Sequence, residues 1–296
     1  MKSTATVVAA APSRTTDLVA LAKPRLNLLV VVSAVAGYVM ANGDTHDVWR
    51  LLFTIVGTGL VAGGASAFNQ VIERQTDSLM QRTRLRPIPA GRLVTRDAWV
   101  FGTLLTIAGL TILAVGANLL SAIVAFATFA SYVAVYTPLK RHSSFSTVIG
   151  AIPGALPPVI GWAAALDELS QGAWVLFGIV FLWQLPHTLA IARLYRDDYA
   201  CAGIRVLPVV DPDGGSTERQ IVAGCLALHA AGLLPTLVGL TGGIYFFGAL
   251  LLGALFLVAG MAQALRPSIP AARRVVLASV IYLPVLLALM ALDKVG

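Results

Sequence analysis

Charged residues are scarce in this sequence, and their scarcity excludes most soluble folds. Asp, Glu, Lys and Arg make up 12% of the 296 residues, and hydrophobic residues make up 57%. A typical soluble domain is about 25% charged. The mean hydropathy of +0.82 agrees with this imbalance. A net charge of +7 could indicate nucleic-acid binding, but the long apolar runs favour a membrane protein with basic loops.

Cysteine and targeting signals are equally sparse. Cys201 and Cys225 show neither metal-ligand spacing nor a disulfide framework, so we expect both thiols to be inert. The first 25 residues lack a continuous apolar segment followed by a cleavage site, and we expect no signal peptide there. They also contain too little arginine for a mitochondrial transit peptide.

Apolar stretches recur along the chain at about the length that a helix needs to cross a bilayer, roughly 20 residues. We predict an all-α polytopic protein with a short cytoplasmic segment, 1–22, before one transmembrane domain, 23–296. The fifth stretch contains "AIPGALPPVIGW", which indicates a broken or closely packed helix beside a cavity. The nine predicted spans are 26–41, 49–73, 98–115, 118–138, 147–165, 171–194, 220–240, 242–264 and 273–293.

The distribution of basic residues predicts the orientation. Nineteen of the 21 Lys and Arg residues lie in the N-terminal segment or in every second loop, with the adjoining helix ends. Arg50 and Lys294 alone fall on the other side. By the positive-inside rule, the N-terminus is cytoplasmic and the C-terminus lies outside, as an odd number of spans requires.

One short segment, "NQVIERQTDSLMQRTRLRPIPAGR" at 69–92, concentrates polar groups directly after an apolar run. Asn69, Glu73 and Asp77 recur every four residues, so on a helix they lie along one face. This acidic ladder offers the oxygen ligands that Mg²⁺ prefers. Acids near the hydrocarbon boundary are costly and usually functional.

A second acidic pair, Asp197 and Asp198, follows the sixth span and could face the ladder. Each of the two spans concerned begins near a tryptophan and ends in acidic and basic residues, which indicates a loose internal repeat. Arginines beside these acids match phosphate oxygens, because guanidinium binds them in a bidentate manner. Topology alone also explains basic inner loops, and an exposed loop paired with Arg196 would explain the second pair.

These segments resemble the UbiA superfamily of intramembrane prenyltransferases. The 69–92 segment and "ARLYRDDYACAGIRVLPVV" resemble the two acidic motifs of its haem-modifying branch, and "LAKPRLNLL" and "YTPLKR" also match. The resemblance extends over nearly the whole chain after about the first fifteen residues. It implies a UbiA-type helical bundle with a cytoplasm-facing cavity.

The resemblance also implies a reaction. Farnesyl diphosphate and haem b would be the substrates, Mg²⁺ the cofactor, and haem O and diphosphate the products. Metal binding and catalysis would fall to Asn69, Glu73, Asp77, Asp197 and Asp198. Diphosphate binding would fall to Arg25, Arg74, Arg82, Arg86, Tyr136, Lys140 and Arg141. Many superfamily members have aspartates where this chain has Gln70, Glu73, Tyr195 and Tyr199. These departures leave it undecided how well a second Mg²⁺ would be bound.

Two residues keep alternative interpretations. His187, in the sixth span, is either a ligand or guide for haem iron or a hydrogen-bonded core histidine beside Pro186. Tyr136 either lines the diphosphate pocket or anchors its helix at the membrane interface.

Other functions fit parts of the pattern. The nearest alternative is a prenyltransferase for an aromatic acid or quinone precursor. A transporter would place polar groups near the midplane rather than at the inner face, and a non-catalytic oxidase assembly factor would need no Mg²⁺. We expect a bacterial inner membrane, with the mitochondrial inner membrane as the alternative, the lipid bilayer as surroundings, and a haem A synthase acting downstream. No nucleic-acid partner is expected.

Overall fold

The structure is a computed structural model that describes residues 13–41, 47–211 and 213–295. In these ranges the protein is helical, without strands, and one isolated bridge joins Thr241 to Lys294. Nine of the described helical segments are long and apolar enough to cross a membrane. They confirm the all-α class, and each predicted span boundary lies within five residues of the observed one. The protein is a multi-pass membrane protein.

Six spans are single helices, and three are divided. The single helices are α2 (Pro24–Ala41), α3 (Val48–Ile72), α5 (Thr95–Gly116), α10 (Gln171–Leu194), α15 (Gly243–Leu265) and α16 (Ile269–Leu292). The fourth span contains α6 (Leu119–Ala130), η1 (Ser131–Tyr136) and α7 (Thr137–Leu139). The fifth contains α8 (Ser146–Ala155) and α9 (Pro157–Leu166), and the seventh contains α13 (Gly215–Ala231) and α14 (Leu234–Leu237). The predicted break in the fifth span is confirmed: α8 ends at Ala155 and α9 begins at Pro157. Pro157 has no N–H group and therefore cannot make the hydrogen bond that would continue α8.

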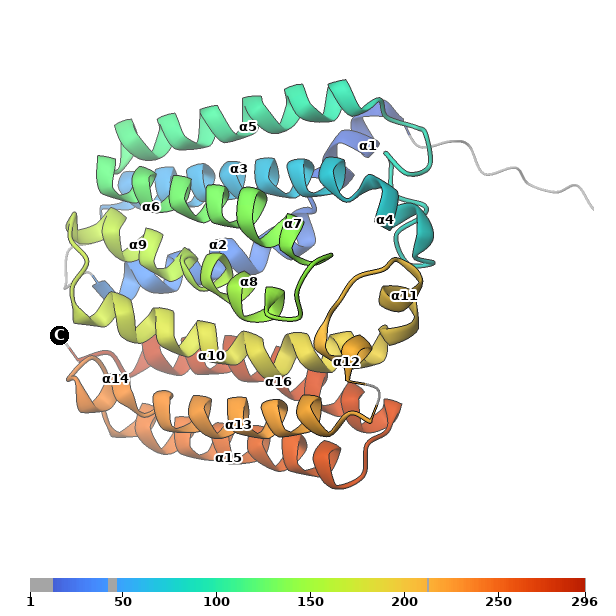
Figure 1. The fold of residues 1–296 in the computed structure, drawn as a ribbon. Helices are drawn as coiled ribbons and strands as arrows, with labels where there is room; N and C mark the ends of the chain where they lie inside the picture. Colours follow the sequence, from blue (N-terminus) through green and yellow to red (C-terminus); the bar gives the residue numbers. More distant parts are fainter. Residues whose placement is uncertain (1–12, 42–46, 212, 296) are drawn as a thin grey trace, which may run out of the picture.

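Four short helices complete the described chain, and the sequence pattern did not indicate them. They are α1 (Arg14–Leu21), α4 (Arg74–Leu79), α11 (Arg196–Cys201) and α12 (Leu207–Val210). All four lie at one end of the bundle, and the C-terminus lies at the other (Figure 1). Helix α1 occupies the described part of the predicted 1–22 segment, and residues 1–12 lie outside the described residues.

The long helices pack side by side and form two neighbouring groups. Helix α3 pairs with α5 and α2, and α2 pairs with α9. On the other side, α15 packs against α13 and α16, and α10 packs against α13, α16, α8 and α9 (Figure 1). The buried apolar core runs through both groups.

Glycines let α2 and α9 approach so closely that their backbones are in contact. A Cβ atom on Gly161 would overlap the carbonyl group of Ala34, and one on Gly37 would overlap that of Pro158. Small residues at such crossings permit the close packing on which helix association in lipid depends. The crossing fixes two walls of the cavity described below.

Gly161→Ala should therefore lower the melting temperature of the purified protein in detergent. The added methyl group forces α2 away from α9, and overpacking of this kind costs about 1–3 kcal/mol. Scanning fluorimetry would measure the change. Gly178→Ala is the matched control, because nothing lies within 4 Å of a Cβ atom at Gly178. Equal losses in both variants would contradict the packing argument.

Candidate active site

The acidic ladder lies where α3 ends and α4 begins. Asn69 is in α3, Glu73 ends that helix with φ −86° and ψ 4°, and Asp77 is in α4. The expected single helix is thus interrupted at Glu73. The ladder survives because the Glu73 N–H donates to the Asn69 carbonyl (2.9 Å) and the Asp77 N–H donates to the Glu73 carbonyl (2.8 Å). The three side chains keep their four-residue spacing.

Each carboxylate of the ladder is paired with a cationic side chain that comes from outside α3 and α4. Lys140 Nζ donates to Glu73 Oε1 at 2.8 Å. Arg86 Nη1 donates to Asp77 Oδ2 at 2.6 Å, and the Asp77 side chain is 1% exposed. Buried carboxylates are retained when paired in this way, because an unpaired charge loses its hydration without compensation.

The amide of the ladder is held from two sides. Lys23 Nζ donates to Asn69 Oδ1 at 3.2 Å. Asn69 Nδ2 donates to the hydroxyl of Thr137, which in turn donates to the carbonyl of Tyr132. Neither Lys23 nor Thr137 was predicted. The sequence analysis selected Arg25 from the same "LAKPR" stretch, but Arg25 is exposed and lines neither cavity described here.

Burial and mutual charge set the pKa values of these groups. Burial lowers the pKa of Lys23 to about 7, and the charge of Arg86 adds to this effect. Burial also raises the pKa of Asp77, although Arg86 opposes it. At Glu73 and Lys140 neighbouring charges outweigh the effect of burial on the pKa. The charge of Lys140 lowers the pKa of Glu73, and Tyr136 and Glu73 raise the pKa of Lys140 well above its usual value.

The second acidic segment lies against the chain that follows α4. Asp198 Oδ1 accepts a hydrogen bond from the backbone N–H of Gln81 (3.3 Å). The guanidinium of Arg82 lies 4.8 Å from the ring centroid of Tyr195 and 4.5 Å from that of Tyr199. The predicted approach of the two segments is therefore observed, through Asp198 and Arg82. Asp197 is exposed and Asp198 is half-buried.

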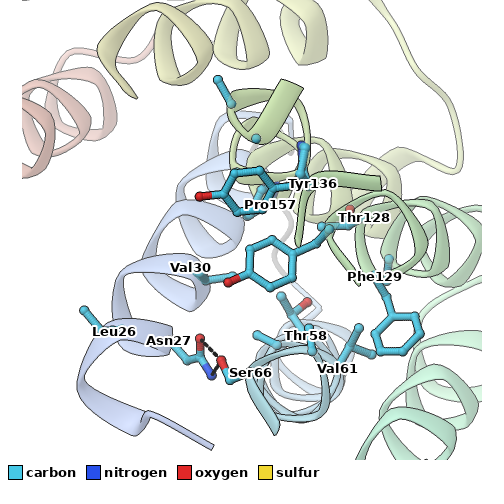
Figure 2. A pocket seen from close by; sticks show the side chains of 18 of the residues that line it. Leu26, Asn27, Val30, Thr58, Val61, Ser66, Thr128, Phe129, Tyr136 and Pro157 are labelled. Carbon is cyan, nitrogen blue, oxygen red and sulfur yellow. Dashed lines mark hydrogen bonds between the residues drawn. The ribbon is translucent and has the colours of Figure 1, made fainter. Parts of the chain in front are cut away.

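A largely apolar cavity of about 270 Å³ opens beside the ladder. Lys23 and Tyr136 line its polar end, and α2, α3 and α6 supply side chains such as Val30, Val61 and Phe129 (Figure 2). Lys140 lies over the ring of Tyr136, 4.4 Å from the centroid. The described protein therefore places three cations and an acidic ladder at one end of an apolar space.

The remaining predicted cations are placed as follows. Arg141 lines a second cavity of about 150 Å³ together with Glu73 and Lys140. Arg74 is exposed and donates to the carbonyl of Val71 at the end of α3. The structure thus brings Arg86, Lys140 and Arg141 to the ladder, but not Arg25 or Arg74.

His187 faces α16 rather than the cavity. Its Nδ1 lies 2.6 Å from the hydroxyl of Ser279, and its ring stacks on Trp183 at 4.7 Å between centroids. Its neighbours Gln184 and Thr188 line the cavity. This position favours the core-histidine interpretation, and the haem-binding role of His187 stays a prediction.

The ladder suits a hard divalent cation. Asp77 Oδ1 is buried and has no hydrogen-bond partner among the described residues. Two carboxylates and the amide oxygen of Asn69 are the kind of donor set that Mg²⁺ takes when substrate phosphates complete its coordination. Within the described ranges no cluster of three or more His, Cys, Asp or Glu side chains is present. Substrate phosphates or water would supply the remaining oxygen ligands.

The membrane spans of the described residues, with an apolar cavity among them that has a charged mouth, define a membrane-embedded helical protein that fits an amphiphile with an anionic end. The chain belongs to the UbiA prenyltransferase family, whose model matches residues 30–291. This confirms the family predicted from the sequence motifs.

Individual relatives agree with this membership. The chain is 50% identical over 289 residues to the protoheme IX farnesyltransferase of Solibacter usitatus, covering 95% of this chain and 99% of that one. It superposes on a digeranylgeranylglyceryl phosphate synthase structure with a TM-score of 0.79 at 16% identity, covering 94% and 98% of the two chains. A UbiA homologue from Archaeoglobus fulgidus bound to GPP and Mg²⁺ gives a TM-score of 0.63 at 12% identity, covering 93% and 99%. These two structures confirm the fold.

Arg82 should contribute to the attachment between the two acidic segments, beside the Gln81–Asp198 hydrogen bond and the packing of Met80 against Ile204 and Val206. Arg82→Met removes both cation–π contacts, each of about 0.5–1 kcal/mol at an exposed site. Amide hydrogen exchange across 195–206 should then become roughly five- to thirtyfold faster. Tyr199→Phe is the control, since it keeps the aromatic ring. Unchanged exchange in Arg82→Met would show that other contacts hold α11.

Proposed function

We propose that the protein transfers the farnesyl group of farnesyl diphosphate to a vinyl group of haem b, with addition of water, giving haem O and diphosphate. The observation that carries this proposal is the gathering of Lys23, Lys140 and Arg86 with the acidic ladder at the mouth of the apolar cavity. The name of the Solibacter usitatus relative supports the choice of the two substrates.

An amphiphilic diphosphate matches the two ends of the cavity. The prenyl chain would occupy the apolar part between α2, α3 and α6, and the diphosphate would lie near Lys23 and Lys140. Ammonium and guanidinium groups are suitable donors to phosphate oxygens, and they are strongest where water is excluded. The predicted roles of Tyr136, Arg82 and Arg141 extend this binding region.

Asn69, Glu73 and Asp77 would hold Mg²⁺, with Asp197 and Asp198 as the second predicted set. The Archaeoglobus fulgidus homologue with GPP and Mg²⁺ supports a metal in this family. When bound, the metal would supply positive charge that stabilises the departing diphosphate.

The reaction would proceed in three steps, and residues of the chain assist them. The C–O bond of farnesyl diphosphate breaks, and its electron pair leaves with the diphosphate beside Lys23, Lys140 and Arg86. The vinyl group of haem attacks the allylic carbon, which moves the positive charge to the carbon beside the porphyrin. Water adds there and loses a proton to the solvent. The apolar walls, including Val61 and Phe129, keep water from the first cation.

The distribution of basic residues supports an orientation of the protein in its membrane. We place the cavity mouth, the N-terminus and the short helices on the cytoplasmic side of a bacterial inner membrane, and the C-terminus outside. Both organic substrates are apolar over most of their surface, so they would enter from the bilayer. A haem A synthase acting on the product remains a prediction.

Purified protein supplied with haem b, farnesyl diphosphate and Mg²⁺ should yield a haem heavier by one farnesyl group plus water. Asp77→Asn should lower the rate at least a hundredfold, because it removes charge from the ladder at the leaving group. Chelation of Mg²⁺ should do the same. Mass spectrometry of extracted pigment would measure all three results.

Asp211→Asn is the matched control for this experiment. Asp211 accepts hydrogen bonds from the N–H groups of Ser216 and Thr217 at the start of α13, away from the ladder, and asparagine keeps this helix cap. It should retain the wild-type rate. Unmodified haem from folded wild-type protein, together with prenylation of an aromatic acid or quinone precursor, would replace the haem assignment with that alternative.

A further inference from the structure

The turn between α1 and α2 meets the first residue of the ladder in a conformation that needs external support. Lys23 has φ +46°, in the left-handed region, and its ammonium group donates to Asn69 Oδ1. A non-glycine residue in this region costs roughly 1–2 kcal/mol and persists only where its surroundings enforce it.

Two buried amides hold the turn in place. Gln70 Nε2 donates to the carbonyl of Leu21 at 2.9 Å, and Gln70 is 1% exposed. Asn27 Nδ2 donates to the carbonyl of Ala22 at 2.5 Å and also contacts Ser66 of α3 (Figure 2). The two carbonyls belong to the residues that directly precede Lys23, so both contacts restrict the backbone that aims its side chain.

Gln70 and Asn69 are consecutive residues of α3, and they hold the same turn at two points. Asn69 accepts from the tip of the Lys23 side chain, while Gln70 donates to the backbone two residues earlier. Only a side chain with a proton to donate can make the second contact. An ionised carboxylate at position 70 would face the Leu21 carbonyl without a proton to share.

We propose that Gln70 is a positioning residue that places the Lys23 ammonium group at the anionic end of the substrate, where Lys23 binds a diphosphate oxygen. Lys23 lines the cavity at the same end as Tyr136, and Gln70 lines neither cavity described above. Gln70 therefore acts through Lys23 and not by contact with the ligand. This inference rests on the proposed binding of a prenyl diphosphate.

A double-mutant cycle on the full-length protein in lipid nanodiscs tests the coupling. The variants are Lys23→Met, Gln70→Leu and the two together, and the probe is inorganic diphosphate with Mg²⁺, measured by calorimetry. Lys23→Met should weaken binding roughly tenfold to a hundredfold, since it removes one charged hydrogen bond. Gln70→Leu should weaken it about fivefold to twentyfold. The double variant should bind no more weakly than Lys23→Met alone.

Two further variants separate positioning from damage to the fold. Gln70→Met keeps nearly the size but has no hydrogen-bond donor, and it should reproduce the Gln70→Leu loss even if the leucine variant fails to fold. Gln75→Leu makes the same change at an exposed glutamine of α4 and should bind like the wild type. In turnover, the two Gln70 variants should lower kcat as well as raise KM for farnesyl diphosphate, because the Lys23 ammonium group acts on the diphosphate as it departs.

The outcomes distinguish this inference from the proposed function. Independent, additive losses for the Gln70 and Lys23 changes would overturn the positioning role, even if wild-type protein makes farnesylated haem. Coupled losses in protein that never modifies haem would sustain the positioning role and reject the proposed function. Wild-type protein that does not bind diphosphate would overturn both.

Discussion

The structure depends on the compensation of negative charge where the hydrocarbon region ends. Carboxylates at this depth lose most of their hydration, so each must find a cation close by. Glu73 forms an ion pair with Lys140, and Asp77 forms one with Arg86. Arg86 and Lys140 come from two different loops, so the chain must bring the loops after α4 and α7 to the end of α3. The same pairing leaves a dense set of charges at the mouth of an apolar cavity, which is the arrangement that an anionic leaving group requires.

The packing of the helices serves this constraint by keeping the cavity open beside the charges. Glycines let α2 and α9 touch through their backbones, and the proline break between α8 and α9 shapes another wall. In η1 the hydrogen bonds span five residues, a geometry that often marks functional sites. Thr137 follows this segment and contacts Asn69, so the irregular backbone ties the fourth span to the ladder. Local irregularity and charge pairing therefore meet at one place.

The sequence was sufficient for the spans because bilayer thickness imposes a length that hydropathy displays directly. It was also sufficient to indicate that Asn69, Glu73 and Asp77 follow one another along the chain direction, because their spacing is local, and Lys140 lies beside Glu73; the roles of all four stay predictions. It did not predict Lys23, because the choice between Lys23 and Arg25 depends on a left-handed backbone angle that no periodicity encodes. Nor could it orient His187, since direction in an apolar helix depends on which neighbouring helix supplies a polar group, here Ser279. The family resemblance supplied substrates that the residues alone left open.

The two acidic segments share a design but differ in environment. Each long helix, α3 or α10, ends at a residue outside helical geometry and continues into a six-residue helix that carries acids. This likeness accords with the predicted repeat, whose origin remains a prediction. Asp77 is buried, whereas Asp197 is exposed to water. Because a low dielectric strengthens every charge interaction, the first segment provides the stronger field for a bound diphosphate. The second is joined to it through Arg82 and Asp198.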